Sequence, residues 1–227
     1  MAPRLTLGYW DIRGFAQPIR LLLAHAGADF AEEFHSMSGP PDFSKEAWFA
    51  VKPTLPLDFP NLPYLYDAET GVKISQSVTI LRYLGRKFNL IGGSEGERVR
   101  IDLVEQQLVD WRNQGLIFYD PEYVEKHADA YKAGIKEKLA QLSAFLGDRQ
   151  FLSGGSVSYV DFLAYEYLDV HARLLVPGLL SQFPNLEALV KRIEELPGVK
   201  AFMASERFIA YPVNNHQAKW GSKYVPL

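Results

Sequence analysis

Tyr9 is the side chain near the amino terminus with the clearest chemical use. It ends a short apolar run, residues 5–9, and a helical pattern follows, so its phenol stands where a strand gives way to a helix. The sequence has no cysteine, and any thiol chemistry therefore needs a substrate thiol. A hydroxyl that donates to a sulfur anion lowers the pKa of the thiol. We hypothesise that Tyr9 is this donor; the alternative is a strand-end aromatic whose OH meets water.

Two further segments are expected to meet Tyr9 in the fold. A cis bond between Leu62 and Pro63, just before a predicted strand, would turn the Leu62 N–H and C=O outward to pair with a peptide ligand. A proline on an edge strand is the competing interpretation. Gln76 and Ser77 open a helix, whose unpaired N–H groups and positive dipole end favour a carboxylate. A serine at this position can also be only a cap.

The elements that must hold these groups follow the order β-α-β and then β-β-α. We predict a strand at 5–9, a helix from Pro18 to Gly27, a strand at 30–34, a loop at 36–42, a short helix at 44–51, a hairpin of 64–66 with 72–74, and a helix from 76 toward 88. The two strands of the first unit should be parallel. This order is the thioredoxin-like arrangement.

Everything after a glycine-containing linker at 89–96 has a helical pattern. Helices are predicted at 97–118 and from there to 146, after an interruption at Pro121, while Pro184 and Pro197 bracket another short helix. Residues 158–161 form a capping-box pattern, which we interpret as structural. The tail from 211 to 227 is expected to be irregular and to lie over the site. The fold class is therefore an α/β thioredoxin-like domain, residues 1–88, followed by an all-α domain, residues 95–227.

Composition narrows the classes of function. The 227 residues are 48% hydrophobic, and a net charge of -3 gives no large positive field for nucleic acid or an anionic membrane. The first residues lack a signal-peptide pattern and no run is long enough to span a membrane, so we expect a cytoplasmic location. The histidines lack metal-ligand spacing, and no metal site is expected. They are His25, His35, His127, His171 and His216.

Residues 8–14 and 57–64, in this order along the chain, resemble the cytosolic glutathione transferases, and the mu class most closely. The resemblance covers nearly the whole chain. It implies a thioredoxin-like domain that binds glutathione and a helical domain that carries most of the electrophile pocket. It also implies a homodimer, glutathione as co-substrate without a bound prosthetic group, and conjugation of glutathione to hydrophobic electrophiles in detoxification, with Tyr9 as the catalytic residue.

The resemblance also assigns the remaining glutathione contacts. They are Trp10, Phe15, Lys45, Trp48, Lys52, Asn61, Leu62, Pro63, Gln76, Ser77 and Asp110. Lys45 stands where the mu pattern has arginine, and lysine cannot make the planar two-pronged contact with a carboxylate. Asp110 matches an acid that reaches the glutathione of the neighbouring subunit, with a solvated helix-face acid as the alternative. Trp48 could equally be core and Lys52 surface.

Two aromatic residues complete the expected sites. Tyr119 resembles the family's second-site tyrosine, which donates to the electrophile, although its spacing from Asp110 is one residue short. Phe59, between two prolines in a loop, resembles the aromatic anchor of the mu-type dimer, and a loop aromatic folded onto its own domain is the alternative.

A non-catalytic binding or structural relative of the same fold is the rival function. A thioredoxin-type disulfide reductase is excluded, since it needs a cysteine of its own.

Overall fold

A four-stranded mixed sheet forms the amino-terminal part of the protein. The structure is a computed structural model that describes residues 4–225, apart from the side chains of residues 116, 117 and 121. The strands are β1 (Leu5–Trp10), β2 (Phe30–His35), β3 (Tyr64–Asp67) and β4 (Lys73–Ser75), in the order β2-β1-β3-β4. β1 runs parallel to β2 and antiparallel to β3, and β4 pairs antiparallel with β3. The predicted thioredoxin-like arrangement is confirmed.

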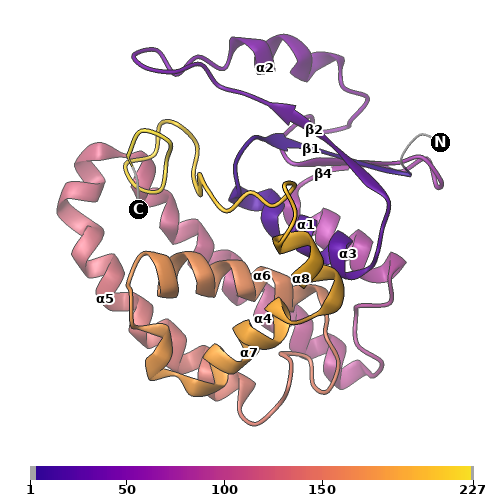
Figure 1. Cartoon of the computed structure of the whole chain (residues 1–227), viewed down its shortest axis with the longest axis vertical. Coiled ribbons are helices and arrows are strands. Elements are labelled where there is room, and N and C mark those ends of the chain that lie inside the picture. The colour runs from indigo at the N-terminus through magenta and orange to yellow at the C-terminus, as the bar shows by residue number, and fades with distance from the viewer. Residues whose placement is uncertain (1–3, 226–227) are drawn as a thin grey trace.

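Helices cover both faces of this sheet. α1 (Gln17–His25) and α3 (Ser77–Lys87) lie on the face toward the helical part of the chain, and α2 (Glu46–Val51) lies on the other (Figure 1). Leu7 and Leu65 are neighbours on β1 and β3, and both are buried together with Ile19 and Leu22 of α1. The apolar strand residues thus have helices to pack against on the covered face, which fixes the position of the β1 end that carries Tyr9.

The rest of the chain is helical, as predicted. The helices are α4 (Glu95–Gln114), α5 (Pro121–Leu146), α6 (Tyr159–Tyr167), α7 (Pro184–Glu194) and α8 (Pro197–Met203). Pro184 and Pro197 each open a helix, where the missing N–H of proline costs nothing. None of the helices between residues 4 and 225 combines the length and apolarity needed to cross a bilayer. The domain limits 1–88 and 95–227 stay a prediction.

The boundaries of α4 differ from the sequence prediction at both ends. Ser94 and Glu97 form a capping box, so the helix begins at Glu95 rather than at 97. It ends at Gln114, and the next five residues form the 3-10 helix η3 (Gly115–Tyr119). Gly115 is a poor helix former, and the ring of His171 lies so close that a Cβ here would stand 2.9 Å from its Cε1.

The capping box predicted at 158–161 is present and buried. The Asp161 carboxylate accepts hydrogen bonds from the Ser158 N–H at 2.7 Å and from the Leu152 N–H at 2.9 Å. Asp161 thereby ties the loop before α6 to the helix start. Beyond Tyr167 the helix continues as a π-helix, η4 (Leu168–Leu174), which no pattern in the sequence indicated.

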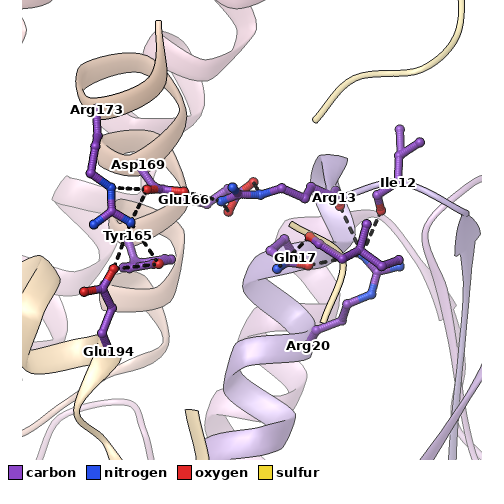
Figure 2. A network of polar contacts seen from close by, with 10 residues as sticks. Ile12, Arg13, Gln17, Arg20, Tyr165, Glu166, Asp169, Arg173 and Glu194 are labelled. Atoms are coloured by element: carbon purple, nitrogen blue, oxygen red, sulfur yellow. Dashed lines mark hydrogen bonds and ion pairs between the residues drawn. The ribbon is translucent and has the colours of Figure 1, made fainter. Parts of the chain in front are cut away.

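A buried ion network joins the turn after β1 to α6 and η4 (Figure 2). The Arg13 guanidinium donates through Nη2 to Glu166 at 2.6 Å and to Asp169 at 2.7 Å, and all three side chains are buried. Burial opposes the charged form of Arg13, but Glu166 and Asp169 raise the pKa of Arg13 above its ordinary value. Arg173 pairs with Asp169 and Glu194, which carries the network outward.

Replacing Arg13 should therefore destabilise the protein strongly. Arg13→Met leaves buried carboxylates without their cation, and we expect the free energy of unfolding to fall by about 3–5 kcal/mol. Urea denaturation followed by tryptophan fluorescence, at one protein concentration, measures the change. The control is Arg98→Ala, whose partly exposed side chain lies 3.8 Å from Glu95 and should contribute about 1 kcal/mol or less. Equal losses in the two variants would contradict the role of the network.

Candidate active site

Tyr9 stands near the end of β1 with its phenol enclosed. Its side chain is 6% exposed, and Oη accepts a hydrogen bond from the Phe15 backbone N–H at 3.0 Å. Burial raises the pKa of Tyr9, while the Phe15 bond and the charges of Arg20 and Arg112 act in the opposite direction. The phenol therefore keeps its proton at neutral pH. Since the Phe15 bond uses a lone pair of the oxygen, the O–H itself is left to donate.

Gly14 makes this arrangement possible. Its φ of +44° lies in the left-handed region, and a Cβ at this position would stand 2.5 Å from Tyr9 Oη. The turn 13–16 can thus fold back over the phenol and deliver the Phe15 N–H to it. The same turn carries Arg13, so the buried ion network also fixes the geometry around Tyr9.

A cavity of about 400 Å³ opens beside Tyr9, a size within the range of roughly 300–1,000 Å³ typical of small-molecule sites. Six of the predicted site residues line it together. They are Tyr9, Trp10, Phe15, Asn61, Leu62 and Tyr119. The sheet, the loop before β3 and the helical part of the chain therefore contribute to one site, as the sequence interpretation required.

The other predicted residues do not line this cavity. Trp48 is buried in α2, with 6.1 Å between the centres of its ring and the Trp10 ring in an edge-to-face arrangement, and so packs against a cavity residue. Lys45 caps α2, and Lys52 follows it at the start of the 3-10 helix η2 (Lys52–Thr54). Asp110 is exposed on α4. The structure thus brings none of these three polar groups to Tyr9 within one chain.

The loop before β3 has the predicted backbone form. The Leu62–Pro63 bond is cis, but the Leu62 N–H differs from the prediction, because it donates to the Asn61 side chain at 2.9 Å. Pro63 itself is buried. It precedes β3, which lies between β1 and β4, so the competing interpretation as an edge-strand proline is wrong.

The start of α3 lies close to an arginine of α4. Gln76 is the N-cap, with a positive φ of 74°, and Ser77 is the first residue of the helix. Ser77 Oγ accepts a long hydrogen bond of 3.5 Å from Nη1 of Arg112, which lines the cavity. A helix N-terminus and a guanidinium thus adjoin each other at the predicted carboxylate site.

The tail covers the site, as expected. The Arg13 N–H donates to the Pro212 carbonyl at 3.0 Å, and the Gly14 N–H donates to Val213 at 3.1 Å. The Tyr119 hydroxyl donates to the Asn214 side chain at 3.2 Å. In Figure 1 the tail, in yellow, runs from the end of α8 across toward the start of α5 and the loop before α2. The tail residues on the cavity wall are Val213, Asn214, Asn215 and Trp220.

Sequence reasoning missed four cavity residues with polar side chains: Arg112, Glu166, Tyr167 and His171. The Arg112 guanidinium lies 4.2 Å from the centre of the Phe15 ring, and its Nε is buried without a hydrogen-bond partner in the described part of the chain. Tyr167 and His171 approach from α6 and η4. Burial lowers the pKa of His171 to about 3, and Lys138 acts in the same direction, so His171 is neutral at physiological pH. Isolated residues on helix faces gave no motif by which to find them.

Comparison with known proteins agrees with this architecture. The family models described as "Glutathione S-transferase, N-terminal domain" and "Glutathione S-transferase, C-terminal domain" match residues 5–86 and 109–206. Glutathione S-transferase Mu 1 of Homo sapiens is 44% identical over 220 residues, which cover 96% of this chain and 99% of the relative. A glutathione S-transferase of Tyrophagus putrescentiae is 45% identical, with 99% of this chain and 100% of that protein covered.

Solved structures show the same likeness. The glutathione S-transferase Blo t 8 superposes with a TM-score of 0.86 at 35% identity, covering 95% of this chain and 99% of that one. A Pi-class glutathione S-transferase of Onchocerca volvulus gives a TM-score of 0.80 at 30% identity, with the same coverage. Family models, full-length relatives and solved structures together establish that this chain belongs to the glutathione S-transferase family and is mu-like in class.

Proposed function

We propose that this protein conjugates glutathione to hydrophobic electrophiles and that the Tyr9 hydroxyl stabilises the glutathione thiolate. The observation that carries the proposal is the enclosed phenol, whose oxygen already accepts the Phe15 N–H and whose proton is left to donate beside the cavity. A free thiol titrates near about 8.5, so little thiolate exists at neutral pH without such help. Each unit by which the pKa falls corresponds to about 1.4 kcal/mol of preferential stabilisation of the thiolate.

The reaction then needs no group from the protein beyond hydrogen-bond donors and charge. The S–H bond breaks and its proton passes to solvent, while the thiolate attacks the electrophilic carbon to form an S–C bond. In a substitution, the leaving group departs with the electron pair of the broken bond. Arg112 adds a positive charge to the same cavity wall, which favours the anion. Tyr119 is proposed as a donor to the electrophile.

Glutathione itself would lie along the predicted contacts. We propose that Leu62 pairs with its cysteinyl backbone, the ligand replacing the Asn61 side chain as the partner of the Leu62 N–H, and that Gln76 and Ser77 hold the γ-glutamyl carboxylate. The free N–H groups at the start of α3 and the adjoining Arg112 support this placement, because both attract an anion. Trp10 and Asn61 would contact the same ligand, and Lys45 and Lys52 would act on its glycine end. The cytoplasmic location and the lack of a prosthetic group stay predictions.

A homodimer completes the proposal. The Phe59 side chain is 77% exposed, and Val99 and Leu103, four residues apart on α4, are 56% and 61% exposed. Val99 and Leu103 lie one helical turn apart, and contiguous exposed apolar surface of this kind commonly marks a protein interface. We propose that Phe59 anchors in a partner subunit and that Asp110 reaches the glutathione bound there.

Replacing Tyr9 by phenylalanine tests the catalytic role. One hydrogen bond to a charged group contributes about 1.5–3 kcal/mol, so kcat should fall roughly 10- to 100-fold in conjugation of 1-chloro-2,4-dinitrobenzene. Glutathione affinity should change little, and the pKa of bound glutathione, read from thiolate absorbance, should rise. Tyr123→Phe, at an exposed position on α5, is the control. An unchanged thiol pKa in the Tyr9 variant would reject the mechanism.

Sedimentation tests the dimer. Phe59→Ala should weaken association by roughly 30-fold or more if the ring is an anchor, because such residues contribute about 2 kcal/mol or more. The control is Phe49→Ala, which removes a phenylalanine of α2 that is also exposed, at 57%. A monomeric wild type, or a Phe59→Ala dimer as tight as the wild type, would overturn the assignment.

A further inference from the structure

A cluster of three polar aromatic side chains stands beside the electrophile cavity, apart from the groups used so far. It consists of Tyr131 of α5, Tyr167 of α6 and His171 of η4. His171 Nδ1 and Tyr131 Oη are 2.9 Å apart, and the His171 ring stacks on Tyr167 with 4.7 Å between centroids. Tyr167 and His171 line the cavity. The proposed conjugation mechanism assigns no role to these three side chains.

The Tyr167 hydroxyl has no hydrogen-bond partner among the described residues. The residue is 3% exposed, and its Oη is buried without a hydrogen bond from any described residue. Buried hydroxyls in native proteins are nearly always paired, because leaving one unpaired costs about 1–3 kcal/mol. The Tyr167 side chain borders the cavity, so a ligand oxygen there can supply the missing partner once the ring turns its hydroxyl toward the cavity.

His171 provides a second hydrogen-bond donor, because its tautomer can be assigned. A phenol is a good donor and a poor acceptor, whereas an imidazole nitrogen is a good acceptor, so we assign Tyr131 O–H as the donor to Nδ1. The neutral ring then carries its single proton on Nε2. Tyr131 thus selects the tautomer in which the remaining nitrogen is a donor.

Gly115 shows where the edge of the His171 ring lies. A Cβ at position 115 would stand 2.9 Å from Cε1 of His171, 3.2 Å from Oη of Tyr131 and 3.7 Å from Nε2 of His171. Only glycine leaves room for the pair, and Gly115 itself lines the cavity. The Cε1 corner of the ring, next to Nε2, therefore packs against the Gly115 part of the cavity wall.

We propose that Tyr167 and His171 form an oxygen-binding subsite within the electrophile cavity. Phe118, Leu163 and Val170 also line the cavity and are apolar, and Tyr167 and His171 add hydrogen-bond donors to these apolar groups. These two donors suit a hydrophobic electrophile that carries a hydrogen-bond-accepting oxygen, as in a nitro or carbonyl group. This oxygen lies away from the carbon that the thiolate attacks. The oxygen orients the substrate and is unchanged by the reaction. This inference rests on the proposed function, since the cavity must hold an electrophile joined to glutathione.

Two conjugates of equal heavy-atom size test the subsite. S-(4-nitrobenzyl)glutathione carries the acceptor oxygens, and S-(4-isopropylbenzyl)glutathione replaces them with methyl groups. Titration calorimetry gives Kd for both, and the wild type should prefer the nitro conjugate. Tyr167→Phe and His171→Leu should each reduce that preference roughly 3- to 10-fold, the value of one hydrogen bond. Tyr131→Phe, which acts through the tautomer of His171, should reduce it less.

The controls separate this inference from the proposed function. S-methylglutathione reports the glutathione contacts alone, and its affinity should be the same in the wild type and in every folded variant. Tyr123→Phe, on the same helix as Tyr131 but exposed, should keep the full preference. A wild type that fails to bind S-methylglutathione would overturn the proposed function and the subsite with it. A wild type that binds it without favouring the nitro conjugate, or variants that keep the preference, would overturn the subsite alone.

Discussion

The buried pairing of Arg13 with Glu166 and Asp169 is the constraint on which the site depends. A guanidinium and two carboxylates without water are tolerated only when they face one another closely, and here their positions come from segments more than 150 residues apart. The backbone of the same turn donates to the Tyr9 hydroxyl and to the tail. One ion network thus fixes the sheet, the helices and the tail around a common cavity.

The two arginines near the cavity, Arg13 and Arg112, differ in whether a carboxylate compensates their charge. Arg13 is neutralised by its partners, while Arg112 has a ring and a serine hydroxyl beside it and no carboxylate among the described residues within ion-pair distance. Arg112 therefore brings a positive charge without a carboxylate partner in the described chain to the cavity that Tyr9 lines. A positive charge fixed in a buried cavity stabilises an anion such as a thiolate. The groups that provide this environment are few, and the packing of α1, α4 and α6 holds them in place.

The sequence predicted those features that short-range chemistry controls. Apolar runs located the strands, prolines and glycines located helix ends, and the position of Tyr9 after an apolar run located the phenol. Helix boundaries near 115 were wrong because the ring of His171, distant in sequence, decides what fits there. Tyr167 and Arg112 were missed for the same reason, since a side chain's role on a helix face depends on which neighbour it meets. The predicted contacts at Lys45, Lys52 and Asp110 lie beyond the cavity, where only a ligand or a second subunit could bring them into play.

The tail adds a consequence for how the protein is made. Two sides of the cavity come from opposite ends of the chain, because Trp10 and Phe15 meet Val213 and Trp220. During translation, the residues that form the sheet and several helices are synthesised before the tail. The cavity is incomplete until residue 220 has left the ribosome and packed against the rest of the site. Catalytic competence is therefore reached only after residue 220 has been synthesised, however early the rest of the fold forms.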